Sequence, residues 1–166
     1  MGYRLTKEDI RKMEDEILYR KRDLRPELLE KVKEARSHGD LSENFEYHAA
    51  KREKNKNDSR IRYLERAIRN AVMIEDRRDE DEAGLNKKAR LYMEEDGVEQ
   101  TCYIVTTMRA NALKGRVSIE SPLGKALLGH KKDDRVEVRV SDSYSFHAVI
   151  LSVESFDESE IPISNY

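Results

Sequence analysis

Tryptophan is absent from this sequence of 166 residues, and cysteine occurs only once, as Cys102. A single cysteine excludes an intramolecular disulfide, so nothing in the sequence requires an oxidising compartment. No apolar run approaches the ~20 residues needed to cross a bilayer, and the first residues lack the apolar stretch of a secretory signal. These absences argue against membrane and disulfide-stapled secreted proteins, and we expect a cytoplasmic protein with no membrane partner.

Charged residues, in contrast, make up 40% of the chain, against 37% for hydrophobic residues. This balance is typical of long paired helices, which keep much solvated surface around a narrow core. The first 75 residues carry 19 Lys and Arg against 16 Asp and Glu, whereas the remainder carries 13 against 18. This weak asymmetry argues against general nucleic-acid binding, but it permits a local nucleic-acid contact on the first part and a protein contact on the second.

Residues 1–75 follow the pattern of an antiparallel helical hairpin with its tip at 39–44. Thr6 can cap the first helix, and Pro26 predicts a kink near 22–25, unless two shorter helices are joined there. The second helix is expected from about residue 43 to about residue 74. The apolar seams comprise Ile10, Met13, Ile17, Leu24, Leu28, Val32 and Ala35 in the first helix and Ile61, Leu64, Ile68 and Ala71 in the second.

The middle and the tip of the hairpin offer fewer apolar residues. Residues 51–60 include none, so polar contacts should hold the two helices together there. Near the tip we expect Phe45 and Ala49 to pack, and Tyr47 either packs across the tip or stacks on a nucleic-acid base.

The second half changes to short strand-like stretches that predict a small antiparallel domain over residues 87–155. Residues 76–86 form a predicted linker, because their charge run offers nothing to bury, and residues 156–166 are expected to be a flexible tail. Ser121 and Pro122 suit the N-cap and first position of one short helix. The fold class is therefore α+β. The expected strands are 89–93, 101–107, 116–120, 135–140 and 146–153.

Two carboxylates, Asp40 and Glu43, fall at the predicted tip. Their spacing suits a capping arrangement, in which Asp40 caps the second helix and the charge of Glu43 interacts favourably with the positive end of the helix dipole. The other interpretation is that they hold a divalent cation or activate water at a partner's site. Because Mg²⁺ takes six oxygen ligands, two carboxylates alone cannot form its site, and a partner or a substrate phosphate must supply the rest.

Basic residues recur along the second helix at a spacing of four. Arg52, Lys56 and Arg60 should share one face, with Lys51 and Lys54 beside them. Such a row is either an ordinary solvated face or a contact for RNA phosphates, and the composition leaves both open.

Residues 34–51, EARSHGDLSENFEYHAAK, resemble the tip signature of the bacterial transcript cleavage factors GreA and GreB. A second stretch, SPLGKALLG at 121–129 followed by DDRVEV at 133–138, resembles the C-terminal domain of that family, which has an FKBP-like fold. The resemblance extends to about residue 155, and the modest basic row favours GreA over GreB. Residues 106–109 depart from the usual sequence pattern of the family, which leaves open which strand residues would contact a partner.

The resemblance implies a transcription elongation factor that acts on bacterial RNA polymerase and has no enzymatic activity alone. The C-terminal domain would bind at the polymerase secondary channel, and the hairpin would reach the active centre. There Asp40 and Glu43 would help to hold a second Mg²⁺, supplied at the polymerase and not bound stably by this chain alone, with its attacking water. The polymerase would then cleave the 3′ end of its backtracked nascent RNA. RNA contacts are expected at Arg36, Lys51, Arg52 and Lys56, and polymerase docking at Ser121, Pro122, Asp133 and Asp134.

Two rival functions stay open. A secondary-channel regulator without cleavage activity should carry an altered acidic tip, whereas this tip keeps both acids. A hairpin chaperone or prolyl isomerase should act on peptides without polymerase, and the second domain has few aromatic residues for a prolyl pocket. These aromatic residues are Tyr92, Tyr103, Tyr144 and Phe146.

Overall fold

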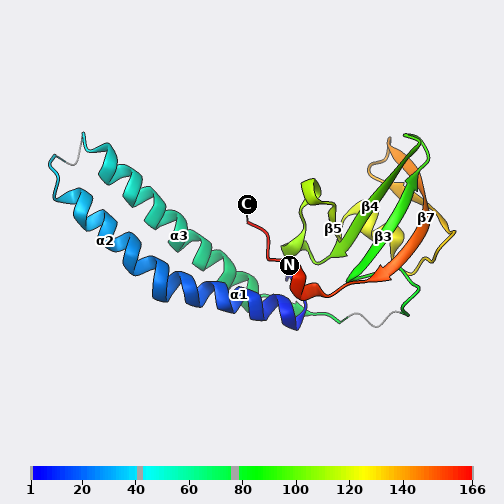
Figure 1. The fold of residues 1–166 in the computed structure, drawn as a ribbon, viewed down its shortest axis with the longest axis horizontal. Coiled ribbons are helices and arrows are strands. Elements are labelled where there is room, and N and C mark those ends of the chain that lie inside the picture. Colours follow the sequence, from blue (N-terminus) through cyan, green and yellow to red (C-terminus); the bar gives the residue numbers. More distant parts are fainter. Residues whose placement is uncertain (1, 41–42, 76–78, 166) are drawn as a thin grey trace. The chain divides into compact units, whose positions relative to one another are not determined.

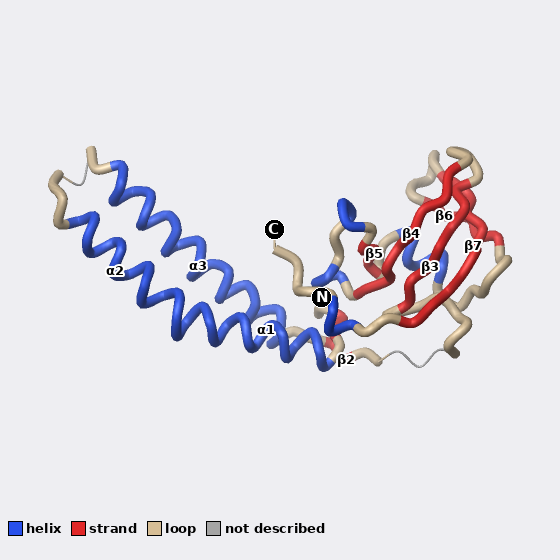
Figure 2. The backbone as a smooth tube through the Cα atoms, in the orientation of Figure 1, coloured by secondary structure: helices blue, strands red, loops and turns tan. Residues whose placement is uncertain are grey.

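The computed structural model describes residues 2–40, 43–75 and 79–165, which divide into two compact units. The first is the helical hairpin, Ile10–Ala71, and the second combines Arg4–Asp9 with the chain from Val72 onward. Figure 1 shows the hairpin helices, and Figure 2 shows the strands that build the second unit. The predicted α+β class is confirmed. No helix within the described ranges is long and apolar enough to span a bilayer.

The first arm of the hairpin is one helical path with a change of geometry near its middle. Helix α1 (Lys7–Tyr19) passes into a π-helical segment (Arg20–Leu24), and α2 (Arg25–Arg36) follows directly. Pro26 lies in the first turn of α2 and, having no N–H, cannot donate a hydrogen bond to the preceding turn. The π-helical segment lies directly before it, and there the backbone N–H of Arg25 donates to the carbonyl of Arg20. The irregularity predicted around 22–25 is therefore a π turn, and the two α-helices are joined without a loop.

The second arm, α3 (Phe45–Arg69), is shorter than predicted at both ends. Asn44 is its N-cap: the side-chain oxygen accepts a hydrogen bond from the backbone N–H of Tyr47 at 3.0 Å. The amide group of Asn44 also donates to the backbone carbonyl of Ala35 at 2.7 Å, which ties the cap to the first arm. The prediction that Asp40 caps this helix is therefore wrong.

Beyond α3 the chain leaves the helix earlier than its apolar pattern suggested. Residues Val72–Met73 form strand β2, which pairs in parallel with β1 (Arg4–Leu5). The backbone N–H of Ile74 donates to the carbonyl of Leu5 at 2.9 Å. The predicted boundary of the hairpin at residue 75 is accordingly too late, because these backbone groups are paired in a small sheet of the second unit.

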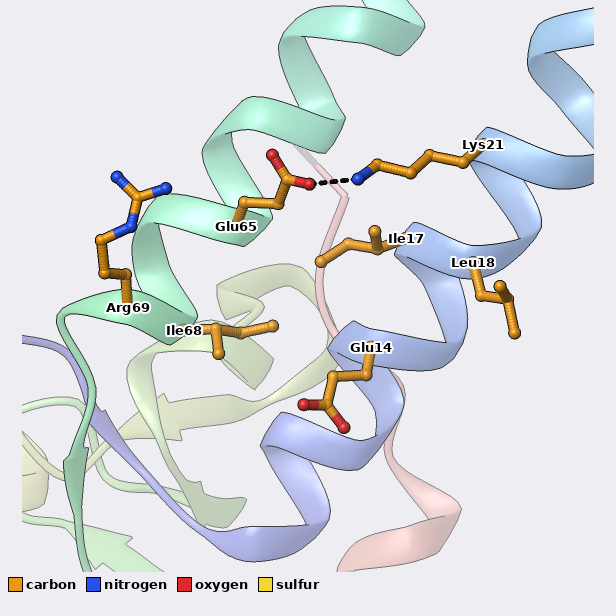
Figure 3. A pocket seen from close by; sticks show the side chains of 7 residues that line it. All are labelled: Glu14, Ile17, Leu18, Lys21, Glu65, Ile68 and Arg69. Carbon is orange, nitrogen blue, oxygen red and sulfur yellow. Dashed lines mark hydrogen bonds and ion pairs between the residues drawn. The ribbon is translucent and has the colours of Figure 1, made fainter.

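Apolar contact between the arms is concentrated toward the start of α1 and the end of α3. Met13, Ile61, Leu64 and Ala67 are buried. Figure 3 shows Ile17 and Ile68 pointing into the same groove between α1 and α3, with the ion pair of Lys21 and Glu65 beside them. This part of the predicted seam is confirmed.

Polar contacts hold the middle of the hairpin, as predicted. Arg60 is only 9% exposed and donates two hydrogen bonds to the carboxylate of Glu16, at 2.9 and 3.2 Å. Arg20 donates to the same carboxylate at 2.8 Å and to the side-chain oxygen of Asn57 at 2.9 Å. Burial alone would raise the pKa of Glu16, but the hydrogen bonds from the two arginines outweigh it, and this pKa is lowered.

Replacing Glu16 with glutamine should destabilise the hairpin by about 1–3 kcal/mol near neutral pH, because two arginines lose their charged acceptor. A carboxylate with a lowered pKa adds stability above its ordinary pKa of 4.5, and this stability is lost as the pH falls through the lowered value. Urea unfolding followed by far-ultraviolet circular dichroism should therefore show a difference that shrinks in acid. Glu14→Gln, at an exposed position of the same helix, is the control; a Glu16→Gln effect independent of pH would contradict the interpretation.

The second unit is built on a five-stranded sheet in the order β5-β4-β3-β7-β6. Every predicted strand is present, with small shifts at the ends. The pairings of β3 with β4, β3 with β7 and β6 with β7 are antiparallel, as predicted, whereas β4 and β5 pair in parallel, so the sheet is mixed. Two 3₁₀ turns, Thr107–Arg109 and Ala112–Lys114, lie in the connection between β4 and β5. The strands are β3 (Lys87–Met93), β4 (Val98–Val105), β5 (Arg116–Ser118), β6 (Arg135–Arg139) and β7 (Ser145–Ser155).

Helix α4 (Pro122–Leu127) begins as predicted. The hydroxyl oxygen of Ser121 accepts a hydrogen bond from the backbone N–H of Gly124 at 3.1 Å, which makes Ser121 the N-cap. A Cβ atom on Gly124 would lie 2.0 Å from the carbonyl oxygen of Ser118. Only glycine lets α4 approach the end of β5 this closely.

Two segments that were predicted to lack structure pack in the second unit. In the predicted linker, Ala83 and Leu85 are buried in the core of the sheet, so the prediction of nothing to bury is wrong; residues 76–78 lie outside the described residues. The predicted flexible tail is also wrong. Ile161 and Ile163 are buried, and the backbone N–H of Ser164 donates to the carbonyl of Met108 at 2.8 Å.

A fully buried ion pair fastens this C-terminal segment to the first turn of α1. The carboxylate of Asp9 accepts from the side chain of Arg109 and from the backbone N–H of Thr6, the latter at 3.0 Å. The Thr6 hydroxyl accepts from the backbone N–H of Asp9 at 3.1 Å, which completes a reciprocal cap and confirms the predicted start of the helix. Arg109 also donates to the backbone carbonyls of Glu158 and Ile161.

Candidate functional site at the hairpin tip

The acid pair lies in the connection between α2 and α3. Gly39 has a φ of +138°, in the region that favours glycine, so the chain turns where the sequence predicted. Asp40 and Glu43 follow, both exposed, and Asn44 then opens α3. Residues 41 and 42 lie outside the described residues. Among the residues that are described, no three His, Cys, Asp or Glu side chains gather as a metal site.

Tyr47 holds the two arms together just below the tip. Tyr47 is 8% exposed, and two cations lie over its ring: the guanidinium of Arg36, 5.6 Å from the ring centroid, and the ammonium of Lys51, at 5.9 Å. The hydrogen bond from Arg36 is the main cause that lowers the pKa of the Tyr47 hydroxyl, and Lys51 adds to it. The expected packing of Tyr47 across the tip is confirmed, because Arg36 belongs to α2 and Lys51 to α3.

A second contact joins the arms nearer to the turn. The Nδ1 atom of His38 lies 3.0 Å from a carboxylate oxygen of Glu46, and both side chains are exposed. The hydrogen bond to Glu46 raises the pKa of His38 above its usual value. Together with the Asn44 cap, this contact fixes both ends of the loop that carries the acid pair.

The predicted RNA-binding residues divide into two groups. Arg36 and Lys51 pack on Tyr47, and their contact with RNA stays a prediction beside this structural role. Arg52 and Lys56 are exposed on α3 and remain candidates for RNA binding. Arg60, which the spacing placed in the same row, is buried against Glu16 and is therefore not part of an exposed basic face.

Phe45 and Ala49 do not pack at the tip, contrary to expectation. Phe45 is 86% exposed, and Ala49 is exposed as well. At 100° per residue, Phe45 and Tyr47 point to nearly opposite sides of α3, so only one of them can face α2. Tyr47 takes that place, which leaves Phe45 in solvent. The rotation of 100° per residue would have predicted this orientation of Phe45 and Tyr47 if the first residue of the helix had been known.

The residues predicted to dock on polymerase each have a local structural role in the second unit. Ser121 caps α4, and Pro122 is exposed in its first turn. Asp133 has a φ of +74°, and its backbone N–H donates to the carbonyl of Ile150 at 2.7 Å. The carboxylate of Asp134 accepts from the backbone N–H of Lys131 at 2.9 Å, which is the main cause of its lowered pKa. Their docking role stays a prediction.

Two family profiles match consecutive parts of the chain. The one described as "Transcription elongation factor, N-terminal" matches residues 3–73, and the one described as "Transcription elongation factor, GreA/GreB, C-term" matches residues 78–155. The chain belongs to the GreA/GreB family of transcription elongation factors. The interval between the two matches falls close to the division between hairpin and sheet, although Arg4–Asp9, which the first profile covers, belongs to the second unit.

Relatives in this family match over nearly their full length. The transcription elongation factor GreA of Lachnoclostridium phytofermentans is 40% identical over 151 residues, which cover 90% of this chain and 94% of that protein. GreA of Geobacillus kaustophilus is 44% identical over 138 residues, covering 82% and 87%. Among solved structures, GreA factor homolog 1 (Gfh1) of Thermus thermophilus is 24% identical, with coverage of 93% and 100% and a TM-score of 0.43.

Proposed function

We propose that this GreA/GreB-family chain binds RNA polymerase and stimulates the polymerase to cleave the 3′ end of its backtracked RNA. The observation that carries the proposal is the division of roles at the tip. Asn44, not Asp40, is the N-cap of α3, and Asp40 and Glu43 are both exposed at the turn of the hairpin. Carboxylates presented in this way can enter the active site of another molecule.

The donor set is consistent with a Mg²⁺ site that is shared with a partner. Asp40 and Glu43 offer carboxylate oxygens, the ligands that Mg²⁺ prefers, and no further acid joins a cluster within the described residues. The remaining ligands would come from the polymerase and from an RNA phosphate. A metal held there supplies neutralisation of charge on the scissile phosphate and a water of lowered pKa.

The surroundings of the acid pair serve to position it. The Tyr47 contact with Arg36 and Lys51 ties α2 to α3, and the pairing of His38 with Glu46 repeats the tie closer to the turn. The described residues that flank the acid pair, His38 and Asn44, are therefore each tied to the opposite arm. Pre-positioned groups lose less conformational entropy when a metal and a phosphate arrive.

The decisive experiment adds the full chain to stalled, backtracked elongation complexes in the presence of Mg²⁺. We expect release of short RNA fragments from the 3′ end, and no cleavage of the same RNA without polymerase. Binding to polymerase without fragment release would support a regulator that lacks cleavage activity and would contradict the proposal. Failure to bind polymerase, together with activity on unfolded peptides, would favour a chaperone or prolyl isomerase.

A further inference from the structure

The largest exposed apolar side chain near the acid pair is that of Phe45. It is 86% exposed. Phe45 is the first residue of helix α3 and lies two residues after Glu43 in the sequence. An exposed phenylalanine contributes nothing to the packing of the hairpin, and Tyr47 already fills the space between the arms. The side chain is therefore available to a partner.

Phe45 stands in line with two exposed cations. Arg52 and Lys56 follow it by 7 and 11 residues, which at 100° per residue puts all three within about 40° of one another on the helix. All three are exposed, and they face away from the side on which Tyr47 packs. The stripe formed by Phe45, Arg52 and Lys56 extends for roughly 16 Å along α3, at 1.5 Å per residue.

We propose that Phe45 stacks on an unpaired base of the displaced single-stranded 3′ segment of the RNA, in line with the phosphate contacts already predicted for Arg52 and Lys56. The inference rests on the proposed function, and it adds a base contact that family membership and the acid pair do not supply. Proteins that hold single strands combine cations along the backbone with aromatic rings under the bases, and such stacking tolerates any base sequence.

A nucleic-acid partner suits the stripe better than an apolar pocket on a protein. The centre of a protein interface is depleted of charge, because burying a charge without a partner is costly. Phe45 instead heads a row of two exposed cations that phosphates could neutralise. Arg52 and Lys56 would contact RNA phosphates whatever the base sequence. Phe45 would contact a base.

The test uses stalled, backtracked complexes whose displaced RNA carries 2-aminopurine, a fluorescent base that is quenched by stacking. Asp40→Asn is present throughout, so that the RNA stays intact. We expect this chain to quench the fluorescence and Phe45→Ala to abolish the quenching and to weaken RNA binding about five- to tenfold, the lower range for one stacked base. Phe45→Tyr should retain both effects, whereas Phe45→Leu, apolar but not aromatic, should behave like Phe45→Ala.

Tyr19→Ala provides the matched control, because Tyr19 is an aromatic side chain, 54% exposed, on the other arm. This substitution should change neither the quenching nor the binding of RNA. Equal RNA binding by Phe45→Leu and the parent would show that an aromatic ring is not required and would overturn the inference, as would quenching that persists in Phe45→Ala. If the wild-type chain releases RNA fragments but no quenching occurs, the inference fails and the proposed function stands. Quenching without fragment release by the wild-type chain would support the base contact of Phe45 and contradict the proposed stimulation of cleavage.

Discussion

Substitution of Asp40 by asparagine is expected to lower stimulated RNA cleavage by roughly a hundredfold or more while polymerase binding is retained. The amide keeps the size of the side chain and removes the charge that we propose helps to hold the metal. Because a bound metal contributes several kcal/mol to the stabilisation of a phosphoryl transition state, loss of one of its ligands should appear almost entirely in the rate of cleavage. The rate of fragment release from stalled complexes measures it.

Glu43→Gln should act in the same way, and excess Mg²⁺ should restore part of the activity of either variant, since the loss is one of metal affinity. Glu53→Gln is the matched control, because Glu53 is an exposed carboxylate on the same arm and lies well below the tip. Unchanged cleavage by Asp40→Asn or by Glu43→Gln would refute the role proposed for the acid pair. Loss of polymerase binding in these variants would instead assign the acids to docking.

Replacing Asp9 with alanine should destabilise the sheet unit by about 3–5 kcal/mol, the usual cost of leaving one member of a buried ion pair without its partner. Asp9 and Arg109 are 0% and 1% exposed, so water cannot replace the lost carboxylate. The same arginine holds the backbone carbonyls of Glu158 and Ile161. Disturbing its position should therefore also loosen the C-terminal segment.

Cys102 reports on this unit directly. It is buried, and burial raises the pKa of its thiol to about 11, so the thiol should react slowly with a disulfide reagent until the sheet opens. Asp9→Ala should speed this reaction in proportion to the lost stability. Asp15→Ala removes an ion pair with Arg11 that is 3.1 Å long and exposed, and it should change stability by less than about 1 kcal/mol. Equal effects of the two substitutions would contradict the argument.

Features with a local sequence signal were predicted well. The turn at Gly39, the cap at Thr6, the cap at Ser121 and every strand of the main sheet depend on residues within a few positions of one another. The parallel pairing of β4 with β5 and the contact of Asp9 with Arg109 join residues far apart in the sequence. No periodicity can reveal such pairings, because the fold alone brings the partners together.

At the tip, the sequence identified the acids but not the division of roles among their neighbours. Asp40 and Asn44 are both good N-caps by residue type, and the choice between them depends on the bond from Asn44 to the carbonyl of Ala35 on the other arm. That choice sets the first residue of α3. It thereby decides that Tyr47 packs inward and that Phe45 does not.

The polar contacts in the middle of the hairpin also fix the alignment of its two arms. Arg60 meets Glu16, and Asn57 meets Arg20, in one alignment of the arms only. A slip by one helical turn, about 5.4 Å, would leave these groups buried and unpaired, whereas apolar side chains alone could find new neighbours. The network therefore keeps the two arms in one register. As a result, the acid pair lies at a constant distance from the opposite end of the hairpin.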